Sequence, residues 1–249
     1  MASKAHPQSV SPGFNGFPEE GIRFLRRLKQ HNDRDWFREH KEMYDQYVHE
    51  PMKALVFAVS ADCRARGLPL HIKEKSPVMR VYRDIRFSKD KSPFKTHVAA
   101  ELRRSFSGSN CLLYIHIGPD ESLLAAGVWQ PERPLLHAWR EMIVREPDRF
   151  ERMRSTASGR GLDLYSGHSL SMMPRGFQNY SNEAFGRWLK LTSFVVERPL
   201  RPSDYSGPGF VQTVVEFALA AKPLFEFGWR VEETESKSFP KHIHEGDVV

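Results

Sequence analysis

The middle of this chain replaces helical spacing with a two-residue alternation of apolar and polar side chains. A repeat of two is typical of a strand that presents one face to a core and the other face to solvent. The stretches SFSGSN and GPDES, which separate three of the alternating segments, have the composition of hairpin turns. The pattern predicts a four-stranded antiparallel meander with strands at residues 78–87, 97–104, 111–117 and 123–129.

Helical spacing occupies the chain on both sides of this predicted sheet. We expect a helix from Pro18 to Gln30, a second helix capped by Asp33, and a break or kink at Pro51 before a third helix. The remaining expected elements are helices at 52–66, 134–145, 147–158, 183–191 and 210–227, the last kinked or ended by Pro223, and a strand at 192–196. The predicted fold class is therefore α+β, with the meander in the middle of the chain packed against N-terminal and C-terminal helices.

The length and composition fit one folded domain. A chain of 249 residues with 40% hydrophobic residues can bury a sizeable core, and we expect a single domain at 14–231. Residues 1–13 are small and polar, and residues 232–249 carry clustered charges, so both are expected to be flexible tails. No run approaches the roughly 18 apolar residues of a membrane span, which predicts a cytoplasmic protein without a membrane partner. Two cysteines, Cys63 and Cys111, predict buried thiols rather than disulfides.

Positive charge is concentrated in one tenth of the chain. The formal net charge is +6, and residues 80–104 hold eight basic and three acidic side chains, which accounts for five of those six charges. Such a field favours anionic ligands or nucleic acid. We therefore expect an anionic small molecule as partner, through a phosphate or carboxylate group, with nucleic acid as an alternative.

The strand pattern places the polar side chains of this region on one face. Arginines on both sides of Asp84 would keep donors for an anion, and the irregular loop FSKDKSPFK adds hydroxyl and lysine donors. Trp129 could stack on a planar ligand. The expected polar face comprises Arg80, Tyr82, Asp84, Arg86, His97, Glu101, Tyr114 and His116, and the predicted ligand-binding residues are Arg80, Arg83, Arg86, Ser88, Asp90, Lys91, Lys95 and Trp129. The structural alternative is a solvated face whose charges pair across strands.

Acid–base chemistry is the only catalytic class for which the sequence offers candidates. Histidine changes charge near neutral pH, so Asp84, His97 and His116 are the predicted catalytic residues, with Asp90 and Glu101 as further acids. No zinc-type spacing joins these side chains, so no metal site is predicted. A nucleophile elbow and a dinucleotide fingerprint are both missing from the sequence. The cofactor and the oligomeric state are left open.

Several longer segments resemble one known family. GIRFLRRLKQHNDRDWFREHK, YRDIRFSKDKSPFKTH, YIHIGPDESLLAAGVWQPE and MPRGF together resemble the domain of unknown function family 2461, from about Phe14 to Arg230. The resemblance implies a soluble α+β domain and implies no reaction. Relatives commonly continue after MPRGF with an aspartate-histidine-proline stretch and a helix ending in Lys-Ser-Phe. Here Tyr180-Ser181-Asn182 and Thr192 stand at those places, so the resemblance implies altered chemistry if that segment belongs to a site.

Three hypotheses follow from these patterns. The first is an enzyme or binding domain that holds an anionic small molecule on the basic residues, with His97 or His116 as acid or base. The second is a nucleic-acid-binding module, with Tyr82, Phe94 or Trp129 stacking on bases. The third is a non-catalytic interaction protein in which Arg83 and Asp84 form a buried ion pair between helices and sheet.

Overall fold

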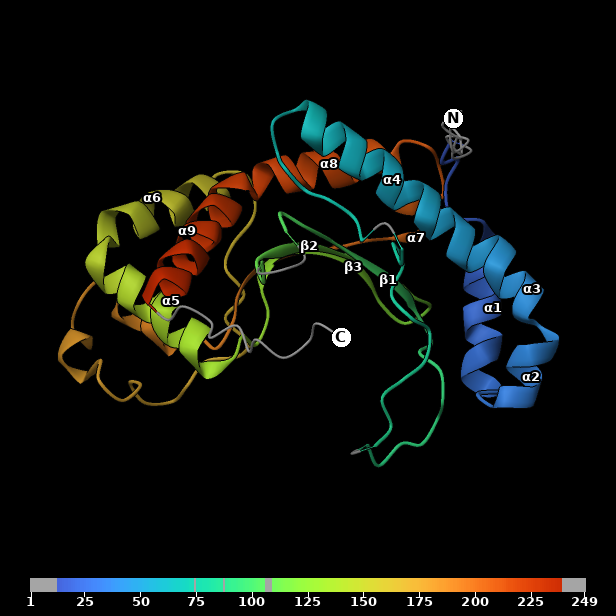
Figure 1. Ribbon diagram of the computed structural model, residues 1–249, viewed down its shortest axis with the longest axis horizontal. Helices are drawn as coiled ribbons and strands as arrows, with labels where there is room; N and C mark the ends of the chain where they lie inside the picture. The colour runs from blue at the N-terminus through green and yellow to red at the C-terminus, as the bar shows by residue number, and fades with distance from the viewer. Residues whose placement is uncertain (1–12, 74, 87, 106–108, 239–249) are drawn as a thin grey trace, which may run out of the picture.

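A four-stranded sheet lies at the centre of the molecule, with helices over one of its faces and at both of its ends (Figure 1). The computed structural model describes residues 13–73, 75–86, 88–105 and 109–238. The strands are β1 (Val98–Arg103), β2 (Leu112–Ile117), β3 (Ser122–Val128) and β4 (Phe194–Pro199). They pair antiparallel in the order β1-β2-β3-β4, so the predicted α+β class with a central antiparallel meander is confirmed.

The N-terminal helices form because caps and apolar spacing agree along the sequence. Helix α1 (Glu19–Gln30) begins after Pro18 with two acids in its first turn, where the helix dipole favours negative charge. The Asp33 carboxylate caps α2 (Arg34–Glu39) by accepting from two backbone N–H groups. Helix α3 (Lys41–Tyr44) runs through a π-helical stretch (Asp45–His49) into α4 (Glu50–Ala65). Pro51 lies in the first turn of α4, where the missing backbone N–H of proline removes no hydrogen bond of that helix. The helix α4 therefore continues past this proline.

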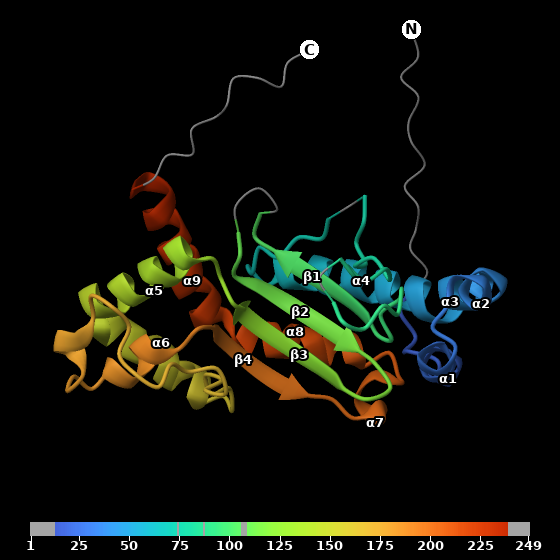
Figure 2. The ribbon, with the colours of Figure 1, turned by 90° about the horizontal axis from the view of Figure 1, so that it is seen from below.

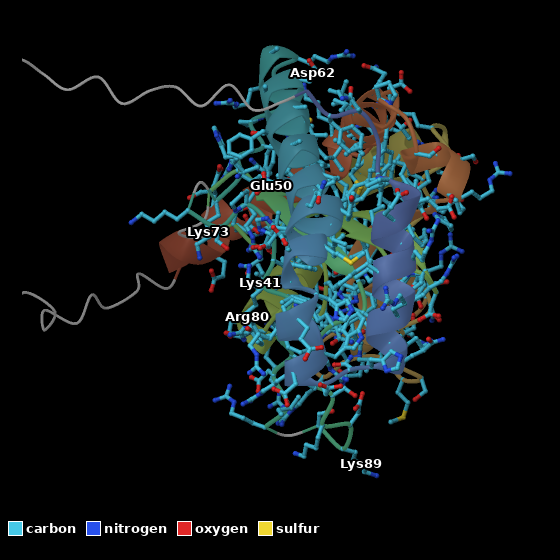
Figure 3. The ribbon with its side chains drawn as sticks, turned by 90° about the vertical axis from the view of Figure 1, so that its right-hand side faces the viewer. Lys41, Glu50, Asp62, Lys73, Arg80 and Lys89 are labelled. Carbon is cyan, nitrogen blue, oxygen red and sulfur yellow. The ribbon has the colours of Figure 1, made fainter. Side chains whose placement is uncertain are left out.

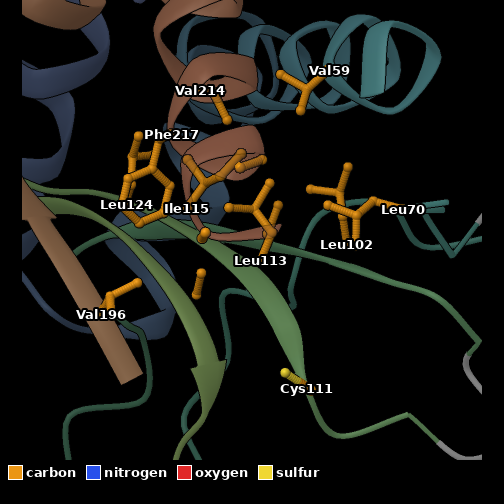
Figure 4. Close-up of a cluster of buried hydrophobic side chains, with 14 of the residues drawn as sticks. Val59, Leu70, Leu102, Cys111, Leu113, Ile115, Leu124, Val196, Val214 and Phe217 are labelled. Carbon is orange, nitrogen blue, oxygen red and sulfur yellow. The ribbon is translucent and has the colours of Figure 1, made fainter. Parts of the chain in front are cut away.

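The sheet has one covered face and one open face, as Figure 2 shows from the open side. Helix α4 packs against β1, and α8 (Phe210–Ala220) packs against β3. The covered face carries Leu113 and Ile115 of β2, which lie in one buried cluster with Phe217 of α8 (Figure 4). On the open face, the register aligns Glu101 with Tyr114, Tyr114 with Ala125, and Ala125 with Glu197. One row of side chains, polar except for Ala125, therefore crosses the open face.

The remaining helices either belong to the connection between β3 and β4 or follow β4 at the C-terminal end. Helices α5 (Arg133–Arg145) and α6 (Pro147–Ser158) follow β3, and 3-10 turns at Gln178–Tyr180 and Gly186–Lys190 precede β4. A short α7 (Pro202–Tyr205) and α8 follow, and α9 (Lys222–Ser238) packs against α5 and α6. The expected helix at 210–227 is two helices, and Pro223 lies at the start of the second. Helix α9 continues through residues 232–238, which the sequence had assigned to the C-terminal tail.

The predicted strand at 78–87 is wrong for the residues that the structure describes, because β4 is the fourth strand instead. Only one isolated bridge, between Tyr82 and Phe94, lies in the described part of that segment. The Asp84 carboxylate accepts from the backbone N–H of Arg86 at 3.2 Å, which is a local turn that competes with a strand ladder. Phe87 of this prediction lies outside the described residues. None of the described helices is long and apolar enough to cross a membrane.

Candidate functional site

A long connection between α4 and β1, residues 66–97, carries most of the predicted ligand-binding residues. It extends past the sheet on the side of the open face (Figure 1), with Arg80 nearer the body and Lys89 toward its far end (Figure 3). Its return limb is fixed by Asn32, whose side-chain amide donates to the Phe94 carbonyl and accepts from the Phe94 N–H, each at 3.0 Å. The buried Phe94 ring also stacks on Phe37 with a centroid distance of 4.2 Å.

The outgoing limb of this connection lies between the return limb and β1. The backbone N–H of Lys95 donates to the Val81 carbonyl at 2.7 Å, and that of Arg83 donates to the Pro93 carbonyl at 2.9 Å. The backbone N–H of Met79 donates to the Ala99 carbonyl of β1 at 2.9 Å. These bonds hold the basic segment beside the sheet and do not make it part of the ladder.

Most charges of the predicted anion site are already paired within the connection. Arg86 donates to Asp84 through Nε at 3.0 Å and through Nη2 at 2.7 Å, which lowers the pKa of the exposed Asp84 carboxyl. Arg83 pairs with Asp90, which also accepts from the Ser92 hydroxyl at 2.6 Å. The buried Arg83–Asp84 pair of the third hypothesis is therefore not formed, because each partner pairs elsewhere.

Two further predicted residues serve the connection itself. The Lys91 ammonium donates to the Ile85 carbonyl at 3.0 Å, which closes the turn around residues 85–91. The backbone N–H of Ser88 also donates to the Ile85 carbonyl, at 3.4 Å. Both contacts lie within the connection, and the Ser88 contact involves only its backbone.

Two cations of the predicted site differ from the others, because neither an acid nor a backbone carbonyl among the described residues bonds to their side chains. Among the described residues, no hydrogen bond or ion pair joins the side chain of Arg80 or Lys95 to another group. Lys95 is half-buried, and burial together with the nearby Arg80 charge lowers the pKa of its ammonium. Arg80 is exposed and also lowers the pKa of Asp84. A bound anion would relieve the repulsion between these two cations.

His97 and His116 lie beside Lys95 at the end of the open face where β1 begins and β2 ends. Their rings stack with a centroid distance of 4.1 Å, and the Tyr114 hydroxyl lies 3.3 Å from Nδ1 of His116 in a hydrogen bond. Burial, His116 and Lys95 lower the pKa of His97 to about 4, and burial also lowers the pKa of His116. Burial therefore favours the neutral form of both imidazoles, and a bound anion would raise the pKa of each and strengthen it as a base. A Cβ at Gly118 would lie 3.0 Å from the Glu121 carbonyl oxygen and 3.1 Å from the Cβ of His97, so a side chain there would require these neighbours to shift by a few tenths of an ångström.

A cleft of about 660 Å³ lies over the open face next to these histidines. Ala125 and Gly127 form part of its floor, and Tyr114 connects it to His116. Trp129 is 51% exposed at the cleft and makes ring contacts with Tyr165 at 6.2 Å and His168 at 5.1 Å. The cleft thus has a floor of small residues and an aromatic wall.

The charge of the cleft is opposite to that of the connection. Four of the described lining residues are glutamates, and the single cation among them, Arg103, already donates to the Glu101 carboxylate at 2.8 Å. Burial and the Glu121 carboxylate raise the pKa of Glu197. Burial, Glu101 and Glu121 raise the pKa of Tyr114. No group of three or more His, Cys, Asp or Glu side chains suited to a metal ion is found in the part of the chain that is described.

The structure brings together only part of the predicted site. Lys95, His97 and His116 lie close to one another with Arg80, whereas Asp84 bonds to Arg86 and makes no described contact with either histidine. Trp129 lines the adjoining cleft, as a ligand-stacking residue should. The predictions missed Glu121, Glu197, Tyr165 and His168, which come from a turn, an outer strand and a loop far apart in the sequence.

The family model described as a conserved hypothetical protein (DUF2461) matches residues 20–227. The chain belongs to this family. The match confirms the resemblance of the sequence segments, and it covers both the unpaired cations and the cleft of this DUF2461 protein. No curated protein and no solved structure matches the chain.

The segment in which this DUF2461 chain departs from the expected pattern adjoins the aromatic wall. The Thr192 hydroxyl donates to the backbone carbonyl of His168 at 2.9 Å, and the His168 ring contacts Trp129. Tyr180 lies in a 3-10 turn and packs against the core through Phe177 and Phe185. The departure therefore affects the support of the cleft wall and not its floor.

Proposed function

We propose that this protein binds an anionic group of a small molecule, a phosphate or a carboxylate, between Arg80 and Lys95 beside the two stacked histidines. The observation that carries the proposal is the half-buried Lys95 ammonium, which is repelled by Arg80 and has no partner among the described residues. Ammonium and guanidinium donors suit phosphate and carboxylate oxygens. A bound anion would also raise the lowered pKa of the neighbouring His97, which would make this imidazole a stronger base next to the bound group.

The alternative of nucleic-acid binding has weaker support. A phosphate backbone that follows the basic connection toward the open face would meet the carboxylates of Glu101, Glu121 and Glu197. These carboxylates would repel the phosphates of a long polyanion, but they leave room for one anionic group at the end of the face. The assignment to the cytoplasm stays a prediction.

Titration with inorganic phosphate, followed by calorimetry at low ionic strength, tests the proposal. We expect Lys95→Ala to weaken phosphate binding by about tenfold, since a half-buried charge-assisted hydrogen bond is worth about 1.5 kcal/mol or more. The matched control is Lys89→Ala, which removes the same charge from an exposed position of the connection. Equal weakening in both variants, or none in either, would contradict a defined site. Tight, steeply salt-dependent binding of a single-stranded oligonucleotide would favour the alternative.

A further inference from the structure

The cleft over the open face is built to hold a ring. Gly127 has φ +124°, and a Cβ there would lie 2.0 Å from the Phe194 carbonyl oxygen, so this part of the floor must lack a side chain. Ala125 is the adjacent floor residue on the same face of β3. With no large side chain on this strip, a flat group can approach the backbone of β3 and lie against the Trp129 wall.

Trp129 is held in the wall by its backbone. The next residue, Gln130, has φ +40°, which is an uncommon conformation for a residue other than glycine. The Gln130 N–H donates to the hydroxyl of the buried Ser193 at 2.9 Å, which fixes this turn to the start of β4. A large aromatic side chain kept half in solvent on a strained turn, and in contact with Tyr165, is an arrangement expected for ligand contact.

The sign of the charge in the cleft selects the ligand. No described lysine or arginine forms an ion pair with Glu121, Glu132 or Glu197, and Arg103 is already committed to Glu101. Histidines are the charged groups near two of them: His168 lowers the pKa of Glu197, and Glu121 raises that of His116. The raised pKa of Glu197 reflects burial first and repulsion by Glu121 second. A positively charged group between these carboxylates would be stabilised by both, and an anion would be repelled. Aromatic faces also attract cations.

We infer that the cleft binds an organic ammonium ion, with its ring or apolar body stacked on Trp129 and its charged nitrogen directed toward Glu121 and Glu197. This site is separate from the anion site at Lys95, because it uses none of the same residues.

Three probes of nearly equal shape separate charge from stacking. Phenethylammonium, 2-phenylethanol and 3-phenylpropionate carry the same ring and differ in the sign of the terminal group. Binding is measured by calorimetry at pH 7, with tryptophan fluorescence as the second readout. We expect the ammonium probe to bind at least about tenfold more tightly than the alcohol, and the carboxylate to bind least.

Variants then assign the contacts. Trp129→Leu and Glu197→Gln should each weaken binding of phenethylammonium by about tenfold, and Glu197→Gln should leave the fold intact because it removes a partly buried charge. The control Glu141→Gln changes an exposed carboxylate on α5 outside the cleft and should have no effect.

Lys95→Ala separates this inference from the proposed function. It should leave phenethylammonium binding unchanged while it weakens phosphate binding. Equal or tighter binding of the alcohol or the carboxylate probe would overturn the inference. So would no binding of the ammonium probe at millimolar concentration, or an unchanged affinity in Glu197→Gln.

Discussion

The side-chain amide of Asn32 pairs with the backbone of Phe94 through two hydrogen bonds of 3.0 Å, one donated and one accepted. Together with the stacking of Phe94 on Phe37, this pair joins the N-terminal helices to the connection that carries the unpaired cations. Because Lys95 follows Phe94 directly, the position of its ammonium depends on a residue 63 positions earlier in the chain.

Replacement of Asn32 by alanine should loosen this connection. The variant leaves the N–H and the carbonyl of Phe94 without their partner, which we expect to lower the free energy of unfolding by about 2 kcal/mol. Phosphate affinity should fall as well, because Lys95 loses its fixed position. Urea unfolding and phosphate calorimetry measure the two effects. Asn179→Ala, at an exposed position, is the control. Unchanged phosphate affinity in a destabilised Asn32 variant would show that the clamp does not position Lys95.

The fold could be predicted well wherever local chemistry and tertiary packing agree. The Asp33 cap, the helix at 147–158 and the strands at Val98, Leu112 and Ser122 all appear within one or two residues of their expected bounds. The strand prediction for residues 78–87 was wrong because the alternation of apolar and polar residues was the only evidence for it. The buried residues in its described part are Val78 and Val81, three positions apart, and the Asp84 carboxylate accepts from the backbone N–H of Arg86 in a local turn.

The site was harder to predict than the fold because its parts are distant in the sequence. The sequence predicted that Arg83 and Arg86 would bind a ligand, but in the structure Arg83 pairs with Asp90 and Arg86 pairs with Asp84. Glu197 lies one residue beyond the predicted strand end, and its place opposite Ala125 depends on the β3–β4 register. No local pattern specifies that pairing across a connection of more than 60 residues.

Gly127 should tolerate no side chain. In Gly127→Ala the new Cβ would meet the Phe194 carbonyl oxygen at 2.0 Å, so β3 and β4 would have to separate at this point. We expect a loss of more than about 3 kcal/mol of stability, or failure to fold. Gly161→Ala is the matched control, because Gly161 also has positive φ (+76°) but has no described atom within 4 Å of the place that an added methyl group would take. It should cost about 1 kcal/mol. Similar melting temperatures for the two variants would contradict the steric argument.

The buried Glu232 of α9 should hold the start of β2 in place. Its Oε1 accepts from the backbone N–H groups of Asn110 at 2.6 Å and Cys111 at 2.7 Å. Glu232→Ala leaves both donors without an acceptor and should destabilise by about 2–4 kcal/mol. Glu232→Gln keeps an acceptor oxygen and should retain most of the stability. Chemical unfolding of both variants provides the comparison, and equal losses would show that packing, not hydrogen bonding, is responsible.

His97 should make the stability of the protein depend on pH. Its pKa in the folded protein is about 4, below the ordinary value of 6.5, so the unfolded chain binds more protons between these values. Stability should therefore be complete above pH 6.5 and should fall as the pH drops toward 4. The loss should be about 1–2 kcal/mol, after allowance for solvent around a half-buried ring. Urea unfolding at about pH 7 and about pH 4.5 measures this change. His97→Gln should show a smaller difference between the two pH values than the wild type, whereas an equal difference would assign the effect to other groups.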